Sequence, residues 1–336
     1  MDGPTAGSLL AVAEETRPRL RTAQDASALE VFEGRYPDML EAMDWFVDAS
    51  RTDEAYRLAS ALVPFWIATK RIDDGDEWFA RALEAPGGTD SHRARAVYDH
   101  GYLVFWTGRY DLAQDRFTEA TALAEALDDH ELEALALAGT ARVALNTNIH
   151  EAVRLLRRAV DVTADLPDSP GRSSAMHVLG VALQMAGDLD GARAIMTERL
   201  ETGRARDNLA VVFSEAANLS MVERQLGNLD HAEGLSLEAL RIAVDRHDEM
   251  AIPWVVNGLA AVTAAKGDPE RAATLVGIAE ALLERAGGEW PPDERAQFEG
   301  TLETLATSGD ADLVERNRAI GRGMGLDVAV AYSFAE

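Results

Sequence analysis

Cysteine is absent from the 336-residue chain, and lysine occurs only twice, as Lys70 and Lys266. Without cysteine there is no disulfide, thiolate zinc site, iron–sulfur cluster or cysteine nucleophile. Aromatic residues make up only 6% of the chain, and no segment of useful length alternates apolar with polar residues, which disfavours strands. No apolar run reaches the length of a transmembrane helix, and no secretory signal is visible. These absences predict a cytoplasmic protein without a membrane partner.

Positive charge is also scarce, since the formal net charge is −26. Such a chain is repelled by nucleic-acid phosphates unless it has a local basic patch. Each cluster of arginines lies beside carboxylates in the sequence, which is typical of solvated helix faces. We therefore predict that this chain does not bind nucleic acid directly.

The residues that are present favour helices arranged in a repeat of about 40 residues. Ala, Leu, Glu and Arg, all good helix formers, dominate the sequence. A small residue recurs at spacings of 38 to 40 residues, in what we predict to be the second helix of each helix pair. These positions are Gly75, Ala113, Ala152, Ala192, Ala232 and Ala272.

Four of these pairs carry two further small residues. One lies in the first helix, and a glycine follows seven residues later at the expected turn, where a positive φ ends the helix. An Asp or Asn after three of the turn glycines predicts a cap for the second helix. The small residues and glycines are Gly101 with Gly108, Gly180 with Gly187, Ser220 with Gly227 and Ala260 with Gly267, and the caps are Asp188, Asn228 and Asp268.

This pattern predicts an all-α protein. Small residues let the two helices of a pair cross closely, and no pair can bury its apolar face alone, so the pairs must stack. We predict one continuous α-α superhelix of about six helix pairs over residues 51–288. Helical caps are expected at residues 1–50 and 289–336.

The spacing of small residue, glycine and alanine resembles the tetratricopeptide repeat (TPR), lengthened from 34 to about 40 residues. Residues 35–49, 58–85, 272–305 and 325–336 resemble the TPR-like helical region of actinobacterial AfsR/LuxR-type ATP-binding transcriptional regulators. The matching segments include RYPDMLEAMDWFVDA and GLDVAVAYSFAE. In that family an ATPase module precedes this region, and a DNA-binding domain often lies at one end. The resemblance implies a regulatory role, although no GxxxxGK[ST] motif occurs in the chain.

The first helices of a TPR stack line its concave face, which predicts the residues of a binding groove. For Tyr98, Tyr102 and Trp106, a place in the core between neighbouring pairs is an open alternative. Polar residues at repeat-related positions favour the groove, because burying them unpaired is costly. The predicted groove residues are Tyr98, Tyr102, Phe105, Trp106, His177, Gln184, Met185, Asn218, Met221, Arg224, Gln225, Trp254 and Asn257.

No catalytic or metal-binding motif appears in the sequence. There is no HExxH, no pair of histidines four apart and no GxSxG. His177 is the one candidate for acid–base chemistry, and a structural or ligand-binding role is the alternative. We predict no metal site and no cofactor.

These observations predict a non-catalytic binding module. Its mixed apolar and polar groove suits a small molecule or a peptide or protein partner. Since Arg224 is the only cation expected to face inward, an acidic C-terminal tail is disfavoured and an apolar helix or amphiphilic molecule is favoured. The alternatives are a stand-alone interaction scaffold and a cofactor-free enzyme that uses the groove for a small-molecule biosynthetic reaction.

Overall fold

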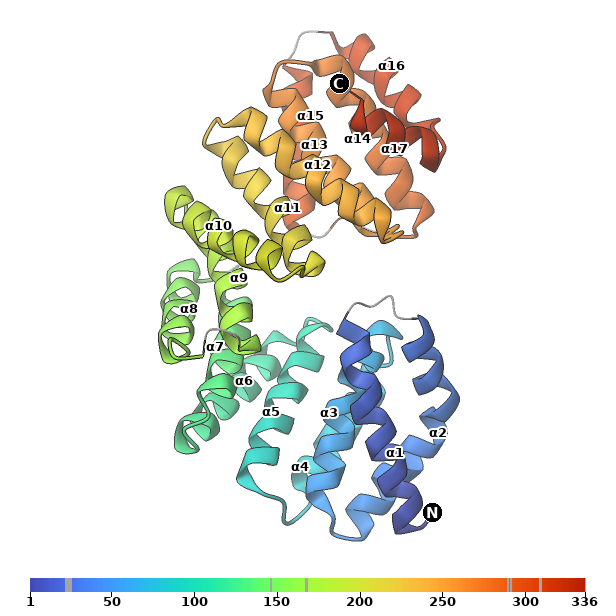
Figure 1. The fold of residues 1–336 in the computed structure, drawn as a ribbon, viewed down its shortest axis with the longest axis vertical. Coiled ribbons are helices and arrows are strands. Elements are labelled where there is room, and N and C mark those ends of the chain that lie inside the picture. Colours follow the sequence, from blue (N-terminus) through green and yellow to red (C-terminus); the bar gives the residue numbers. More distant parts are fainter. Residues whose placement is uncertain are drawn as a thin grey trace. The chain divides into compact units, whose positions relative to one another are not determined.

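The computed structural model describes residues 1–21, 26–145, 147–166, 169–288, 290, 292–307 and 310–335. Throughout these residues the regular structure is helical, as predicted, with no strand (Figure 1). The helices are α1 (Gly3–Thr16), η1 (Arg17–Arg21), α2 (Ala26–Asp48), α3 (Thr52–Ala68), α4 (Ile72–Glu84), α5 (Asp90–Phe105), α6 (Tyr110–Ala126), α7 (His130–Ala144), α8 (Ile149–Val162), α9 (Pro170–Met185), α10 (Leu189–Ala205), α11 (Leu209–Gln225), α12 (Leu229–Asp245), α13 (Ala251–Ala265), α14 (Pro269–Arg285), α15 (Pro292–Ala306), α16 (Ala311–Arg322) and α17 (Leu326–Phe334).

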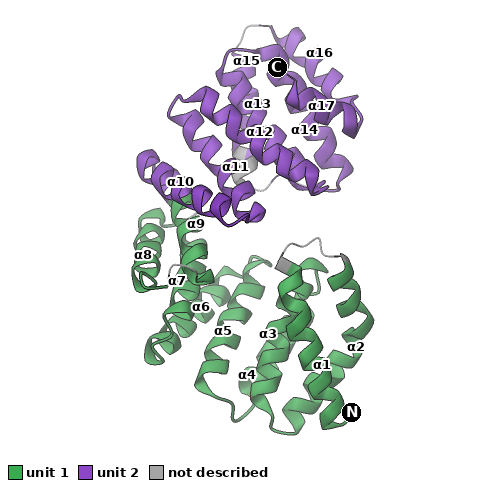
Figure 2. Ribbon diagram, viewed as in Figure 1, with its two compact units in different colours: residues 1–182 green, residues 183–336 purple. Residues whose placement is uncertain are grey.

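The chain divides into two compact units, residues 1–182 and 183–336, with the boundary inside α9 (Figure 2). In the first unit α5 packs on α6, α6 on α7 and α7 on α8, and the first helices α3, α5 and α7 contact one another in turn. In the second unit α10 to α14 pack in the same serial way, and α11, α13 and α15 contact in turn. The partition into two caps and a repeat region stays a prediction, and its boundary at residue 289 lies outside the described residues.

Five of the predicted helix pairs pack as expected, namely α3/α4, α5/α6, α7/α8, α11/α12 and α13/α14. The two helices expected for the sixth pair, α9 and α10, are both present. The recurring small residues are buried, and all five of the alanines are 0% exposed. At Gly101 an added Cβ would lie 2.9 Å from Arg116 Cβ, so a side chain there would separate α5 from α6. The turn glycines have positive φ, as expected: Gly108, Gly187, Gly227 and Gly267.

Two of the three predicted helix caps form. Asp188 and Asp268 accept hydrogen bonds from the backbone N–H groups of Gly191 and Arg271, each at 3.0 Å. The prediction for Asn228 is wrong, because this residue makes no side-chain cap bond. Its Nδ2 instead donates to Oε2 of the buried Glu223 at 2.6 Å, and this charge-assisted hydrogen bond fixes the orientation of the amide.

Near the C-terminal end of the second unit, α14 crosses α16, a contact that the repeat pattern does not predict. Helices α14 and α16 pack with almost no side chain between their backbones. A Cβ added at Gly277 would lie 2.0 Å from the carbonyl oxygen of Arg318, and one at Gly321 would lie 2.0 Å from that of Thr274. The two glycines therefore allow this crossing.

Burial of one histidine in the first unit makes the stability of the fold depend on pH. The His100 ring stacks on Phe79 at 5.4 Å, and its Nε2 lies 2.7 Å from Asp76 Oδ1. Burial lowers the pKa of His100, and the nearby guanidiniums of Arg116 and Arg109 add to this, whereas Asp76 opposes it. The folded state therefore binds the proton more weakly than the unfolded chain does.

We expect the free energy of unfolding to fall on acidification from about pH 6.5 through the lowered pKa of folded His100. The unfolded chain takes up the proton first, so acid favours unfolding over this range. The variant His100→Gln should lack this part of the pH dependence. Urea unfolding of both proteins from about pH 7 to about pH 5 measures the slope, and equal slopes would contradict the assignment.

Candidate functional site

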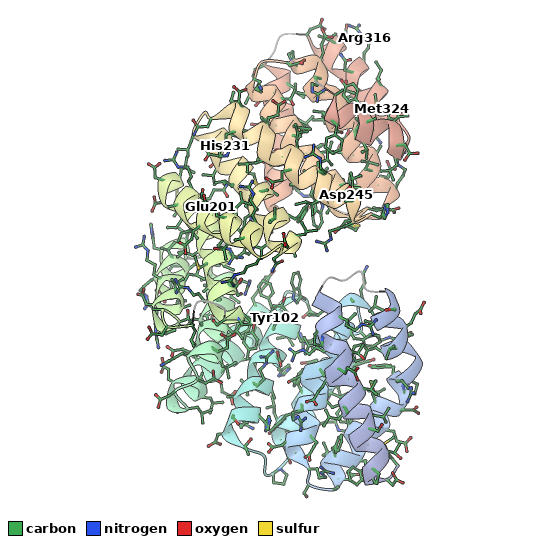
Figure 3. The ribbon with its side chains drawn as sticks, in the orientation of Figure 1. Tyr102, Glu201, His231, Asp245, Arg316 and Met324 are labelled. Atoms are coloured by element: carbon green, nitrogen blue, oxygen red, sulfur yellow. The ribbon has the colours of Figure 1, made fainter. Side chains whose placement is uncertain are left out.

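A row of aromatic rings follows the C-terminal half of α5 to the start of α6 in the first unit, buried at one end and exposed at the other. Tyr98 stacks on Tyr102 at 6.2 Å, and Tyr102 meets Trp106 edge-on at 6.2 Å. Phe105 lies 5.7 Å from Trp106 and 5.6 Å from Tyr110, the first residue of α6. Figure 3 labels Tyr102, toward the C-terminal end of α5. Such a row offers flat apolar faces with polar edges.

The exposed fraction of the side chains increases along this row. It therefore distinguishes core residues from residues that can contact a ligand. Tyr98 is 6% exposed and packs on Phe117 in the core, where burial raises the pKa of its hydroxyl. Tyr102 and Phe105 are half-buried, whereas Trp106 and Tyr110 are 54% and 52% exposed. Tyr98 is thus a core residue, because α5 turns that position toward α6 and α7. The sequence reasoning missed Tyr110, although an aromatic residue directly after the turn was a visible signal.

The predicted residues of α9 fall on both sides of the unit boundary. His177 is half-buried in the first unit and takes part in an interaction within the fold. In the second unit Gln184 is half-buried and Met185 is 50% exposed. Each therefore stays a candidate contact residue of its own unit.

A small cavity of about 160 Å³ lies on the first-helix side of the second unit. It is lined by Arg224 of α11, by Ala261 and Ala265 of α13, and by residues of α15. The hydroxyls of Thr301 and Thr304 already donate to backbone carbonyls of their own helix, at 2.9 and 2.8 Å. The α15 lining residues are Gln297, Gly300, Thr301 and Thr304.

Arg224 is the electrostatic feature of this cavity. Its Nε is buried, and no residue in the described ranges accepts a hydrogen bond from it. Burial lowers the pKa of the guanidinium, and no described carboxylate offsets that shift. A desolvated cation at a cavity wall favours an anionic or strongly polar acceptor.

The other predicted residues of the second unit lie at different depths. Asn257 is fully buried and engaged within the fold, so it lies in the interior and not on an open groove. Trp254 is half-buried, and its buried Nε1 has no acceptor among the described residues. Asn218 and Met221 are half-buried and Gln225 is exposed. The sequence reasoning missed the α15 residues because they lie in the predicted cap, which lacks the repeat signature.

The described part of the chain shows neither a metal-binding cluster nor a membrane-spanning helix. It contains no group of three or more His, Asp or Glu side chains placed to hold a metal ion. None of its helices is long and apolar enough to span a membrane. The arrangement that stands out chemically in these residues is therefore the half-buried Arg224 beside apolar and hydroxyl groups.

Comparison with known proteins identifies the architecture. No protein-family model and no curated protein matches the sequence. The structure is similar to apo RapI, with TM-score 0.59 at 12% identity over 93% of this chain and 85% of that one. It is similar to a Rap protein complexed with Competence and Sporulation Factor, with TM-score 0.58 at 15% identity over 94% and 88%. It also resembles NprR complexed with its cognate peptide NprX, with TM-score 0.54 at 13% identity over 97% and 92%.

The fold is a TPR-like helical repeat. At these identities the likeness extends to the fold and no further. The aromatic row lies on α5 and at the start of α6, and the Arg224 cavity is lined by α11, α13 and α15.

Proposed function

We propose that the chain is a non-catalytic binding module that takes a peptide or protein segment on its first helices. The observation that carries this proposal is the half-buried Arg224 at the wall of the cavity lined by α11, α13 and α15, whose buried Nε has no acceptor among the described residues. An arginine without a described partner costs stability in the free protein. A ligand that supplies an acceptor recovers this cost on binding.

The size of the cavity favours a peptide over a small molecule. Its volume of about 160 Å³ is below the roughly 300–1,000 Å³ of most small-molecule sites. It holds a single anchoring group, such as one carboxylate of a ligand, while the rest of the ligand lies along the helices. Because Arg224 is the only cation among the described residues that line the cavity, we infer a segment with one acidic group and otherwise apolar residues.

The similarity to known proteins supports the proposal that the chain binds a peptide. A Rap protein was solved in complex with Competence and Sporulation Factor and NprR with its cognate peptide NprX, and each similarity covers more than nine-tenths of this chain. Together with the resemblance to AfsR/LuxR-type regulators, this favours a sensing role in a cytoplasmic transcription regulator. The lineage is part of the proposal and rests on the sequence segments given above.

A peptide selected by display on the intact chain tests the proposal. We expect its affinity to fall at least about tenfold in Arg224→Gln, because a charge-assisted hydrogen bond is lost from a desolvated site. The matched control is Arg193→Gln, which removes an exposed arginine paired with Asp190 on α10 of the same unit. Isothermal titration calorimetry measures both. If no peptide is selected, or if both variants bind like the parent, the proposal is wrong.

Without ligand, removing Arg224 should stabilise the protein, although the same change weakens ligand binding. We expect Arg224→Leu to raise the free energy of unfolding by about 1 kcal/mol, because it removes a half-buried cation whose partial desolvation no described carboxylate offsets. Urea unfolding without ligand measures this change. A loss of stability would mean that Arg224 already has a stabilising partner.

A further inference from the structure

A second cavity, of about 310 Å³, lies in the first unit, where α1 and η1 pack against α3. It is lined by three arginines and one carboxylate, although the chain as a whole carries a net charge of −26. The lining residues are Glu14, Arg17, Pro18, Tyr56, Arg57, Ser60, Ala61, His92 and Arg95. A local excess of cations in an acidic protein attracts small anions.

Two of the arginines are held in the same way, by carboxylates that bind one edge of the guanidinium. Arg57 donates from Nε and Nη2 to Glu14 at 2.8 and 2.7 Å. Arg95 donates from Nε and Nη2 to Asp99 at 2.8 and 3.1 Å. In both cases the N–H groups of Nη1 donate no hydrogen bond to the paired carboxylate, and a guanidinium has five donors. The arginines are therefore fixed in position with donors to spare.

The pairing also keeps Arg95 charged at the cavity wall. Asp99 is almost fully buried and lies behind the lining, also 3.8 Å from Arg17. Its charge raises the pKa of Arg95 above the ordinary range. Arginine forks match the planar edge of a carboxylate or two oxygens of a phosphate.

Neutral polar groups complete the cavity. The hydroxyl of Ser60 makes no hydrogen bond with the residues that the structure describes, although this side chain lines the cavity. His92 is fixed through Nδ1, 2.9 Å from Thr89 Oγ1, which leaves Nε2 for another partner. Pro18 and Ala61 supply apolar wall.

We propose that this cavity binds a small-molecule oxyanion, with phosphate or carboxylate groups held by Arg57, Arg95 and Arg17 and a hydrogen bond from Ser60. Its volume lies at the lower end of the range of small-molecule sites, which fits a compact anion. All residues of this site belong to the first unit. Its test is therefore independent of the peptide site proposed for the second unit.

Calorimetry on the intact chain at low ionic strength tests this site with inorganic phosphate and with citrate. We expect at least one of them to bind with sub-millimolar affinity, and the better binder identifies the oxyanion. Affinity should fall at least about tenfold in Arg57→Gln, because a charge-assisted pair is lost. It should fall about threefold to tenfold in Ser60→Ala, which changes no charge and removes one neutral hydrogen bond.

Arg154→Gln is the matched control. Arg154 binds Glu151 through the same two nitrogens, at 2.7 and 2.6 Å, and lines neither cavity. The carboxylate left behind is equally exposed in the two variants, at 39% for Glu14 and for Glu151. We expect binding within about twofold of the parent in this control, because the charge change is the same but distant.

Three results would overturn the proposal. One is no binding of either anion at millimolar concentration. Another is an equal loss in Arg57→Gln and Arg154→Gln, or no loss in Ser60→Ala, which would indicate a general charge effect. The third is equally tight binding of a polyglutamate peptide, which would indicate an acidic macromolecule as the partner. Circular dichroism of each variant confirms that it is folded.

Discussion

Replacing Gly277 with alanine is expected to lower the free energy of unfolding by about 3 kcal/mol. The new Cβ would lie 2.0 Å from the carbonyl oxygen of Arg318, and Gly321 makes the same approach to Thr274 from the other helix. The obstacle is backbone and cannot rotate away, so α14 and α16 must separate. This cost exceeds the intrinsic preference for alanine in a helix, which is about 1 kcal/mol.

The matched control is Gly234→Ala in α12 of the same unit. Gly234 is exposed, and an added Cβ there would meet nothing within 4 Å. Only the helix preference remains, so we expect a gain of about 0.5–1 kcal/mol. Urea unfolding followed by far-ultraviolet circular dichroism measures both variants. If Gly277→Ala were as stable as Gly234→Ala, the backbone contact of α14 with α16 would be wrong.

The second large effect is expected at a buried ion pair in the second unit. Arg199 of α10 donates from Nε to Glu215 Oε1 of α11 at 2.8 Å, and their side chains are 9% and 0% exposed. We expect Arg199→Met to lower the free energy of unfolding by about 3–5 kcal/mol, because the cation that faces a fully buried carboxylate is removed.

A double variant separates this charge effect from lost packing. Arg199→Met combined with Glu215→Leu removes both charges and should recover most of the stability, because apolar residues of similar volume often replace a buried pair without cost. By comparison, Arg193→Met breaks an exposed pair with Asp190 and should cost at most about 1 kcal/mol. A double variant as unstable as Arg199→Met alone would show that packing, not charge, is responsible.

Much of the fold follows from local sequence signals. The recurring alanines and turn glycines have the same roles in each helix pair, so their spacing alone predicts the crossings and the helix ends. The cap at Asn228 failed because Glu223, at the end of the preceding helix, competes for the amide. Competition of this kind depends on distances that the sequence does not contain.

The candidate sites were less predictable. Tyr98 lies within α5 and Trp106 directly follows its last residue, and both aromatic side chains suit a core or a groove. The orientation of each position relative to the neighbouring helices decides which environment it meets. Asn257 looks like a surface residue because it is polar, yet the fold buries it and engages it. Gln297 and Thr301 line the cavity with Arg224, although more than one repeat length of chain separates them from it.

The sequence by itself determined that this protein is all-helical, that its helices form pairs about 40 residues apart, and where most of those pairs turn. These features depend on contacts within a pair, which a short stretch of chain encodes. Only the tertiary structure decided which first-helix side chains are exposed, that Arg224 is desolvated, that arginines of α3 and α5 share a cavity with η1, and that α14 touches α16. Burial and charge at these places depend on residues far apart in the chain, which come together only when the helices pack.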